Sequence, residues 1–353
     1  MPFVHVDPDD AAHVTAVARI QEAARQVDDP EAFPVIPEML AAELRYGWDL
    51  EPAEHYLYVP DAAADPVGVL AVELPTRDNL HLIWAQIWVH PDDRRHGHGS
   101  VIMNEVLRIA RETKRNTIWV GTAEDDQGAR CFVERFGFKY ASHDARRRQV
   151  LADIDQAEIQ RLWASAEAAA SDYCLQRLQP PTSDELLSEL VEVTAAINDA
   201  PMGDLTYEDE KFDLQRVQDL ETALIGRGDS GYRTIARHRQ TGEVGGHSMV
   251  ITHPLHPHVG HQADTAVARR HRGHRLGLLL KIDMMRWLAQ VEPQLKIIET
   301  WNNVDNRFMI NVNEALGYRL SRIFNMYELR VDEARVRSST GSEHILSAKS
   351  SRH

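Results

Sequence analysis

Cysteine is nearly absent from this chain of 353 residues, which contains only Cys131 and Cys174. Two cysteines this far apart exclude a disulfide framework and a paired-thiolate metal motif, and they fit a reducing compartment. No run of about 18 apolar residues occurs, so no membrane partner is expected. The first residues contain neither a basic segment nor an apolar one of the kind that marks a secreted protein. We therefore expect a cytoplasmic protein.

Positive charge is also scarce, because 39 Lys and Arg residues stand against 54 Asp and Glu residues, for a net charge of -15. Nucleic-acid binding needs clustered basic residues, so we expect no nucleic-acid partner. An acidic protein would instead attract a cationic acceptor such as an amine. The length suits two domains, each able to bury its own core.

An internal repeat is the most informative feature that the sequence does have. The segment 89–100 recurs as 267–278, with Val, Arg and Gly at the same relative positions. Further along, the pair Gly137-Phe138 is matched by Gly317-Tyr318 at a displacement only two residues longer. Because both order and spacing are kept, the sequence predicts a duplicated domain.

Strand and helix patterns alternate in the same succession in both copies, which predicts a mixed α/β fold. The main helix of each copy is expected over 100–111 and 274–288, and a closing strand pair is expected to end the first copy. We predict a first domain over 1–154, a helical linker over 155–171, a second domain over 172–331 and a disordered tail over 332–353, where Ser and charged residues dominate.

The pattern Arg94-x-x-Gly97-x-Gly99, placed between a predicted strand and a predicted helix, resembles the pyrophosphate loop of the Gcn5-related N-acetyltransferase (GNAT) superfamily. The resemblance covers most of both copies, because the second helix of each ends in Gly-Phe or Gly-Tyr. It implies two tandem GNAT-like domains, each a mixed and mostly antiparallel sheet flanked by helices. The tandem arrangement of unequal halves also resembles that of mycothiol synthase.

The resemblance implies acetyl-CoA as cosubstrate, with its pyrophosphate at these two corners. Glycine lets the backbone approach an anion, and the start of a helix adds positive potential. The residues expected to bind the cofactor are Val89, Arg94, Arg95, His96, Gly97, His98, Gly99 and Ser100 in the first copy, and Val267, Arg272, Gly273, His274, Arg275, Leu276, Gly277 and Leu278 in the second.

The second copy departs from the pattern at Arg275, which stands where the first loop glycine is expected. A guanidinium there can bind phosphate directly or obstruct the approach of the backbone. Asn303 and Asn306 resemble the family's pantetheine side and are also expected to bind the cofactor. Many members carry a tyrosine four residues before the glycine of the Gly-Phe or Gly-Tyr pair, where it protonates the departing thiolate. Here those positions hold Val133 and Asn313, and Asn313 can hydrogen-bond cofactor or substrate.

A general base is expected on or near the strand before each loop, because the acceptor amine must lose a proton. At matching positions the first copy has Gln86 and the second has Asp264, and only Asp264 can accept a proton. Glu299, at the end of the next strand, is the second candidate. An alternative for Asp264 is that it anchors a neighbouring loop by hydrogen bonds.

The tryptophans, a run of arginines and a histidine-rich segment are each expected to have a structural role. Trp84, Trp88 and Trp119 lie in predicted strands and are expected in the core. The run 146–148, three arginines, is expected at a solvated sheet edge. The histidine-rich segment 253–261 has no helical His-x-x-x-His register and no thiolate, so we expect a loop and no metal.

The sequence therefore predicts an N-acyltransferase that moves an acetyl group from acetyl-CoA to the amine of a small molecule by direct attack. The C-terminal copy is expected to be catalytic, with Asp264, Glu299 and Asn313 as its candidate residues. Two alternatives stay open, a non-catalytic acyl-CoA-binding protein and a protein N-acetyltransferase. A monomer or a homodimer is expected.

Overall fold

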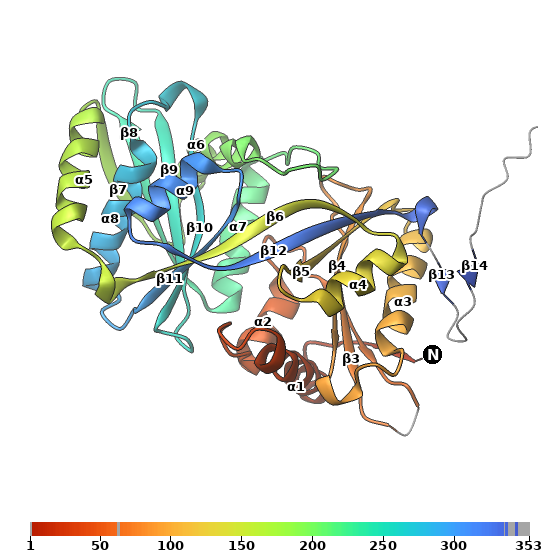
Figure 1. Cartoon of the computed structure of the whole chain (residues 1–353). Coiled ribbons are helices and arrows are strands. Elements are labelled where there is room, and N and C mark those ends of the chain that lie inside the picture. The colour runs from red at the N-terminus through yellow and green to blue at the C-terminus, as the bar shows by residue number, and fades with distance from the viewer. Residues whose placement is uncertain (1, 62–63, 335, 338–342, 345–353) are drawn as a thin grey trace, which may run out of the picture.

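The computed structural model describes residues 2–61, 64–334, 336–337 and 343–344, and Figure 1 shows two lobes joined by two long strands. The N-terminal half runs from the first strand to β6, and the C-terminal half from β7 to β12. No helix of the described residues is long and apolar enough to cross a membrane. Of the tail predicted over 332–353, residues 335, 338–342 and 345–353 lie outside this part.

The two halves repeat one succession of elements. The N-terminal half contains β1 (Phe3–His5), α1 (Ala11–Asp28), α2 (Pro37–Tyr46), β2 (Glu54–Tyr58), β3 (Gly68–Glu73), β4 (Leu82–Val89), α3 (His98–Glu112), β5 (Thr117–Ala123), α4 (Gln127–Phe136) and β6 (Lys139–Val150). After the linker helix α5 (Gln156–Ala169), the C-terminal half contains β7 (Tyr173–Leu178), α6 (Asp184–Ala195), α7 (Leu214–Arg227), β8 (Ser230–His238), β9 (Val244–Thr252), β10 (Val259–Val267), α8 (Leu276–Val291), β11 (Ile297–Asn303), α9 (Arg307–Ala315) and β12 (Arg319–Arg330).

Several short elements supplement the main helices and strands, and some of them recur at the same places in both copies. Single turns of 3-10 helix lie at Pro91–Asp93, Leu151–Asp153, Ala196–Asp199, Arg269–His271 and Val331–Glu333, and the small strands β13 (Val336–Arg337) and β14 (Glu343–His344) pair with each other. The first and fourth turns precede α3 and α8, so the corner before each main helix is built alike.

The two main helices bury different amounts of surface. Helix α3 is amphipathic and packs one face on the sheet through residues that include Ile102, Val106 and Leu107. Helix α8 is apolar on most sides. Its outer face is covered by α5, and Ala166 of α5 lies in the same buried cluster as Leu279 of α8. The predicted linker is therefore a structural layer of the C-terminal half.

One continuous sheet of twelve strands runs through the molecule in the order β1-β2-β3-β4-β5-β12-β6-β11-β10-β9-β8-β7. Its pairs are antiparallel except β4 with β5 and β10 with β11, which are parallel. The predicted mixed, mostly antiparallel sheet flanked by helices is confirmed.

The halves exchange their last strands, as Figure 1 shows where β6 and β12 run side by side between the lobes. The end of β12 pairs with β5, from Phe324↔Ala123 to Arg330↔Thr117, and the end of β6 pairs with β11. The predicted closing strand pair of the first copy is thus wrong. A single strand follows α4, and its partner comes from the other half.

This exchange also overturns the placement of the three arginines at a sheet edge. Residues 146–148 lie in β6, between β11 and β12 near the middle of the sheet. Arg146 is only 3% exposed and Arg147 only 6% exposed. The edge placement was predicted because no partner strand for these residues lies nearby in the sequence. The partner is β12, which lies in the other half of the chain.

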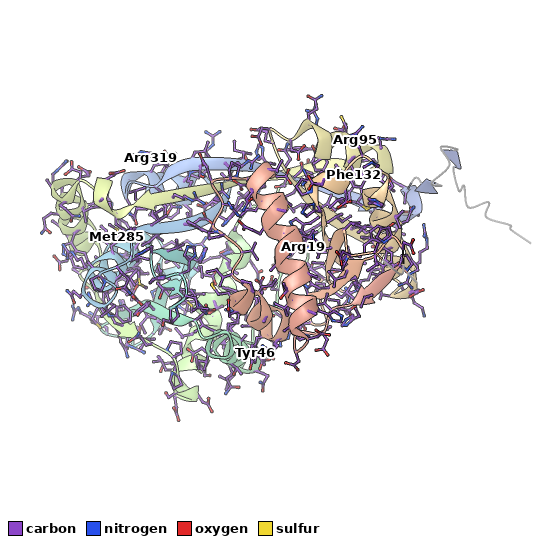
Figure 2. All side chains as sticks on the ribbon, turned by 90° about the horizontal axis from the view of Figure 1, so that it is seen from below. Arg19, Tyr46, Arg95, Phe132, Met285 and Arg319 are labelled. Carbon is purple, nitrogen blue, oxygen red and sulfur yellow. The ribbon has the colours of Figure 1, made fainter. Side chains whose placement is uncertain are left out.

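The α-helices beneath the sheet connect the halves a second time. In the view from below, Tyr46 lies where α2 meets α7 (Figure 2). Its ring fits because residue 226 is glycine, since a Cβ there would come within 2.6 Å of a ring carbon.

Candidate active site

The sheet splays open once in each half. Strands β4 and β5 are paired from Leu82↔Thr117 to Trp84↔Trp119, although both continue for several residues. Strands β10 and β11 likewise pair only as far as His261↔Glu299. Beyond these pairs, the backbone edge of β4 and of β10 that faces the neighbouring parallel strand has no partner in the sheet. Each gap leads to the corner before α3 or α8.

The corner of the N-terminal half has the backbone expected of an anion site. Arg95 and Gly97 both adopt left-handed conformations, at φ +68° and +89°. Gly97 is the N-cap of α3, and no side chain caps the first N–H groups of this helix. Those donors and the positive end of the helix dipole are therefore available to a phosphate.

The corner of the C-terminal half has the same backbone with different residues. Gly273 and Arg275 take the left-handed positions, at φ +88° and +55°, and Arg275 is the uncapped N-cap of α8. Its guanidinium turns away from the corner and donates a 2.6 Å hydrogen bond to the hydroxyl of Ser165 in α5. Arginine thus replaces the glycine without changing the shape of the loop, at a cost of about 1–2 kcal/mol.

The motif arginines bind the protein itself. Nε of Arg94 donates to the carbonyl of Val89 at 3.1 Å, and Nε of Arg272 donates to the carbonyl of Val267 at 3.1 Å. The remaining donors of Arg94 bind Asp28, both at 2.7 Å. These two arginines tie the loop to the preceding strand, so they shape the corner and leave the backbone N–H groups to face an anion.

The other predicted cofactor residues at the corners differ in exposure. Arg95, His96 and Gly97 are exposed, whereas Leu276 and Gly277 are buried. Leu276 packs in the core beneath α5, so only its backbone can serve a ligand. The residues that lie at intermediate depth are Val89, Val267, His98, Gly99, Ser100, His274 and Leu278.

The asparagines of the C-terminal half are engaged inside the protein. Asn306 caps α9 by accepting from the N–H of Met309 at 3.2 Å, and Asn303 donates to the hydroxyl of Ser142 at 2.7 Å. Asn313 is fully buried and donates to the side chain of Asn302 at 2.7 Å. Their roles toward the cofactor stay predictions. In the structure Asn313 holds α9 on β11, Asn303 ties β11 to β6, and Asn306 caps α9.

The two candidate bases have different surroundings. Asp264 lies in a bulge of β10, where the register against β9 shifts between Gln262 and Thr265. Burial raises its pKa, while the positive charge of Arg233 opposes that shift. Among the described residues, no hydrogen bond or ion pair engages its carboxylate.

Glu299 is tied to two arginines of β6. Nε of Arg148 donates to its carboxylate at 2.8 Å, and Nε of Arg146 lies 3.8 Å from the same oxygen. Two guanidiniums thus occupy this carboxylate, which leaves Asp264 as the predicted base with a free carboxylate.

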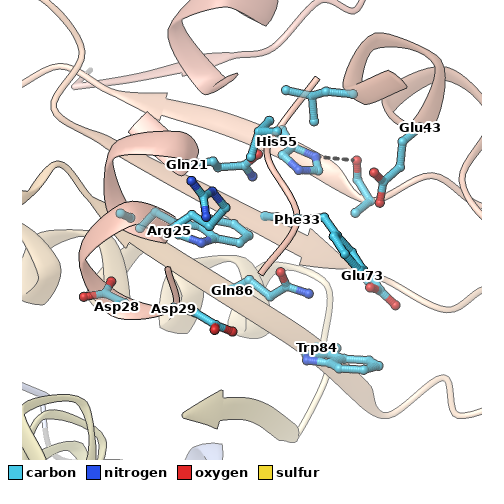
Figure 3. Close-up of a pocket in the computed structure, with 16 residues that line it drawn as sticks. Gln21, Arg25, Asp28, Asp29, Phe33, Glu43, His55, Glu73, Trp84 and Gln86 are labelled. Carbon is cyan, nitrogen blue, oxygen red and sulfur yellow. Dashed lines mark hydrogen bonds between the residues drawn. The ribbon is translucent and has the colours of Figure 1, made fainter. Parts of the chain in front are cut away.

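A cavity of about 390 Å³ lies in the N-terminal half, on the α1 and α2 side of β2, β3 and β4 (Figure 3). Its walls include Phe33, Trp84, Gln86 and Trp88. The core placement predicted for Trp84 is wrong, because this residue is 37% exposed. Trp119 is buried, at 4% exposed, and Trp88 packs partly buried against the core under α1 and α2 while it also lines the cavity.

Glu73 is the functional candidate that the sequence did not single out. It ends β3, lines the cavity and has a pKa that burial raises to about 7, with smaller contributions from the nearby carboxylates Glu43 and Asp49. Nothing in the local sequence marks it, because its burial depends on α1 and α2 folding over the sheet.

No group of three or more His, Cys, Asp or Glu residues that could hold a metal ion occurs in the described part of the chain.

Comparisons with known proteins agree with this geometry. Residues 21–138 match the model of the "Acetyltransferase (GNAT) family". A mycothiol acetyltransferase of Saccharomonospora viridis is 27% identical over 335 residues, covering 90% of this chain and 95% of that protein. Another, from Stackebrandtia nassauensis, is 28% identical over 147 residues, which cover 41% of this chain and 46% of that protein.

Among solved structures, a tandem GNAT protein from the clavulanic acid biosynthesis pathway superposes with a TM-score of 0.77 at 24% identity, covering 93% of this chain and 98% of that one. A GCN5-related N-acetyltransferase from Sphaerobacter thermophilus has a TM-score of 0.63 at 14% identity, covering 94% and 96%. Residues 21–138 thus match the GNAT family of acetyltransferases, and the fold of the whole chain is that of a tandem GNAT protein, because both halves carry the splayed sheet and the corner.

The GNAT family match falls on the half whose loop keeps both glycines. The C-terminal half reaches the same loop conformation with Arg275 and adds the bulge at Asp264, which β4 does not have in its regular pairing with β3.

Proposed function

We propose that this chain transfers an acetyl group from acetyl-CoA to the amine of a small molecule, and that the C-terminal half carries the reaction. The observation that carries the proposal is the free carboxylate of Asp264, placed in a bulge where β10 leaves β11 and directly before the corner of α8. The names of the mycothiol acetyltransferase relatives support a small-molecule acceptor.

Each part of the C-terminal half has a role in this proposal. The backbone N–H groups at the corner from Gly273 to Gly277 would hold the pyrophosphate of acetyl-CoA, which supplies a thioester carbonyl when bound. Asp264 would take the proton of the acceptor ammonium, directly or through a water, because its raised pKa suits a base. The unpaired edge of β10 near Thr265–Val267 would offer N–H groups to the oxyanion. Asn313 would keep α9 in place at the edge of the site.

The substitution Asp264→Asn tests the assignment. It keeps the size of the side chain and removes the proton acceptor, so we expect kcat to fall by about 10²–10⁴-fold. Release of free coenzyme A from acetyl-CoA in the presence of a panel of small primary amines measures kcat. Calorimetric titration with coenzyme A should give an unchanged Kd.

A matched control is Asp209→Asn, which makes the same change at an exposed carboxylate of the segment before α7 and should leave kcat unchanged. Full activity in Asp264→Asn would show that this carboxylate is not the base. Binding of coenzyme A without transfer to any amine would favour the non-catalytic alternative.

A further inference from the structure

A row of three side chains crosses the sheet in each half, at the same place of the repeat. In the N-terminal half the row runs over β2, β3 and β4, because His55 pairs with Ala71 and Ala71 pairs with Gln86. All three residues line the same cavity, so their side chains lie on one face of the sheet. This row carries no charge at pH 7, since burial lowers the pKa of His55.

The row of the C-terminal half carries two charges. Its members are Arg233 in β8, Met249 in β9 and Asp264 in β10, each 178 residues after its counterpart (233−55, 249−71 and 264−86). Arg233 pairs with Met249, and the bulge of β10 that contains Asp264 stands opposite Met249 on its other side. A cation and a carboxylate thus stand at the two ends of this row, where the N-terminal half has a neutral histidine and a glutamine.

The guanidinium of Arg233 is buried within the row. The residue is only 5% exposed, and its Nη2 donates to Sδ of Met249 at 3.4 Å, so the group lies along the row toward Asp264. Its Nη1 is also buried and has no hydrogen-bond partner among the described residues. Burying a cation with a free donor costs stability, and groups of this kind gather at functional sites.

Three neighbouring elements contribute the other ionisable groups that act on the row: α7, β9 and the segment before α7. They are Glu221, His247 and Glu210. Glu221 is already held by Thr182, whose N–H and hydroxyl donate to its carboxylate at 2.9 and 2.6 Å. His247 stays neutral at pH 7, because burial, followed by the charge of Arg233, lowers its pKa to about 3. Of these groups, Arg233 is therefore the one that is a cation at pH 7.

We propose that Arg233 is a positioning residue for Asp264, whose positive charge, held across Met249, keeps the buried carboxylate ionised and ready to accept a proton at neutral pH. The inference rests on the function proposed above, in which Asp264 is the base. Burial alone favours the protonated acid, which cannot serve as a base. A cation at the other end of the row offsets that effect without occupying the carboxylate, whose oxygens stay open to the acceptor amine.

The N-terminal half gives an internal comparison for this role. Gln86 cannot ionise, so its row needs no cation, and the position of Arg233 is held there by the neutral His55. The cation therefore occurs in the half whose row ends in a carboxylate.

Carbon-13 NMR of protein labelled at the aspartate carboxyl carbons measures the effect without acceptor or cofactor. The signal that is missing in Asp264→Asn belongs to Asp264, and its titration gives the pKa. We expect Arg233→Met to raise this pKa by about one unit or more, because the cation that favours the ionised form is gone. Arg233→Lys keeps the charge and should leave the pKa near that of the wild type.

Arg237→Met is the matched control. Arg237 lies in the same strand and donates to Glu189 of α6 at 2.6 Å, so its removal should leave the pKa of Asp264 unchanged. Thermal melting shows whether each variant is folded. Arg233→Gln removes the charge but keeps a hydrogen-bonding side chain, and it should give the same shift if Arg233→Met does not fold.

The pH dependence of kcat carries the effect into catalysis. With one acceptor amine used throughout, the acid limb of the profile should move to higher pH in Arg233→Met by the amount that the pKa of Asp264 rises. Above that limb the rate should return close to that of the wild type. A purely structural role for Arg233 would instead lower the rate by the same factor at every pH.

An unchanged pKa of Asp264 in Arg233→Met, or an equal shift in Arg237→Met, would overturn the proposal, and so would a loss of rate that does not depend on pH. The fate of the base assignment is separate. Full activity of Asp264→Asn would remove the function assigned to Asp264 and leave the pKa shift in place. An inactive Asp264→Asn together with an unshifted pKa would remove the role of Arg233 alone.

Discussion

At the scale of single residues, Lys281 is a buried basic group of the C-terminal half. It lies in α8, is only 3% exposed and stands over the ring of Tyr318, 4.8 Å from its centroid. No carboxylate pairs with it among the described residues. Burial lowers its pKa to about 7, so folding removes a proton that the unfolded chain keeps up to the ordinary pKa of lysine.

Replacing this lysine should stabilise the protein in a pH-dependent way. Between pH 7 and about pH 10 the unfolded chain binds more protons at this site, so the stability of the wild type rises with pH. We predict that Lys281→Met raises the free energy of unfolding by about 1–3 kcal/mol at pH 7. The gain should shrink toward pH 10. Urea denaturation at the two pH values measures it, and an equal gain at both would contradict the assigned pKa.

The sequence predicts single residues well where their role is local. The positive φ of Gly97 follows from a motif of a few residues. A comparison of the two copies of one strand indicates Asp264, whose role as a base stays a prediction. Glu73 and Trp84 could not be found this way, because the cavity exists only after α1 and α2 have packed over the sheet. Arg275 shows that the sequence can also hide a similarity. Its backbone is left-handed like that of Gly97, although arginine does not indicate such a conformation.

At the scale of elements, β6 shows what sequence patterns miss. Three consecutive arginines in a strand predict that the strand lies at the edge of a sheet. In the structure Arg146 donates to Asp29 at 2.7 Å and packs over the ring of Trp301, 6.0 Å from its centroid. Long-range pairing with β12 and β11 turns these arginines into buried ion-pair partners, and no local pattern contains that information.

The buried arginine of β6 should be costly to remove. We predict that Arg146→Met lowers the free energy of unfolding by about 3 kcal/mol, because it leaves Asp29 without this partner and removes one of the two arginines beside Glu299. Arg108→Met removes a half-exposed arginine that pairs with Glu105 and Glu112 on α3, and it should cost less than about 1 kcal/mol. Chemical denaturation compares the two, and equal costs would argue against a structural role for the buried pair.

At the scale of the whole molecule, the exchange of β6 and β12 joins two halves that the repeat alone presents as separate domains. Tyr327 and Leu329 of β12 are buried in the core of the N-terminal half. Leu151 and Ile154, which follow β6, pack against the core of the C-terminal half. The predicted limits at 154 and 172 mark the repeat in the sequence, while each core includes residues from beyond its own limit.

This arrangement predicts one cooperative unfolding unit. Loss of either half would strip a strand and core side chains from the other, so the two halves should unfold together. Scanning calorimetry should give a single transition whose calorimetric and van't Hoff enthalpies agree. Two resolved transitions would show that the exchanged strands contribute little to stability.

The duplication and the fold class were accessible from the sequence, because they depend on repeated motifs and on alternating patterns. The exchange was not, because both halves carry a similar final strand and either pairing satisfies the same pattern of buried residues.

The account depends most on the corner of α8 as the place where coenzyme A is held for transfer. Gly277 and Gly99 occupy the same position in the first turns of α8 and α3. A Cβ at Gly277 would meet only Thr265, at 3.8 Å, and one at Gly99 would meet Phe132 at 3.4 Å. Both sites therefore leave room for a Cβ, and a glutamate at either would repel a pyrophosphate from that corner.

The most direct measurement is the rate of acetyl transfer from acetyl-CoA by Gly277→Glu and Gly99→Glu, each shown to be folded by its melting curve. We predict that Gly277→Glu lowers the rate by more than about 100-fold, whereas Gly99→Glu retains it. Activity that survives Gly277→Glu and disappears in Gly99→Glu would contradict the assignment and place the reaction in the N-terminal half.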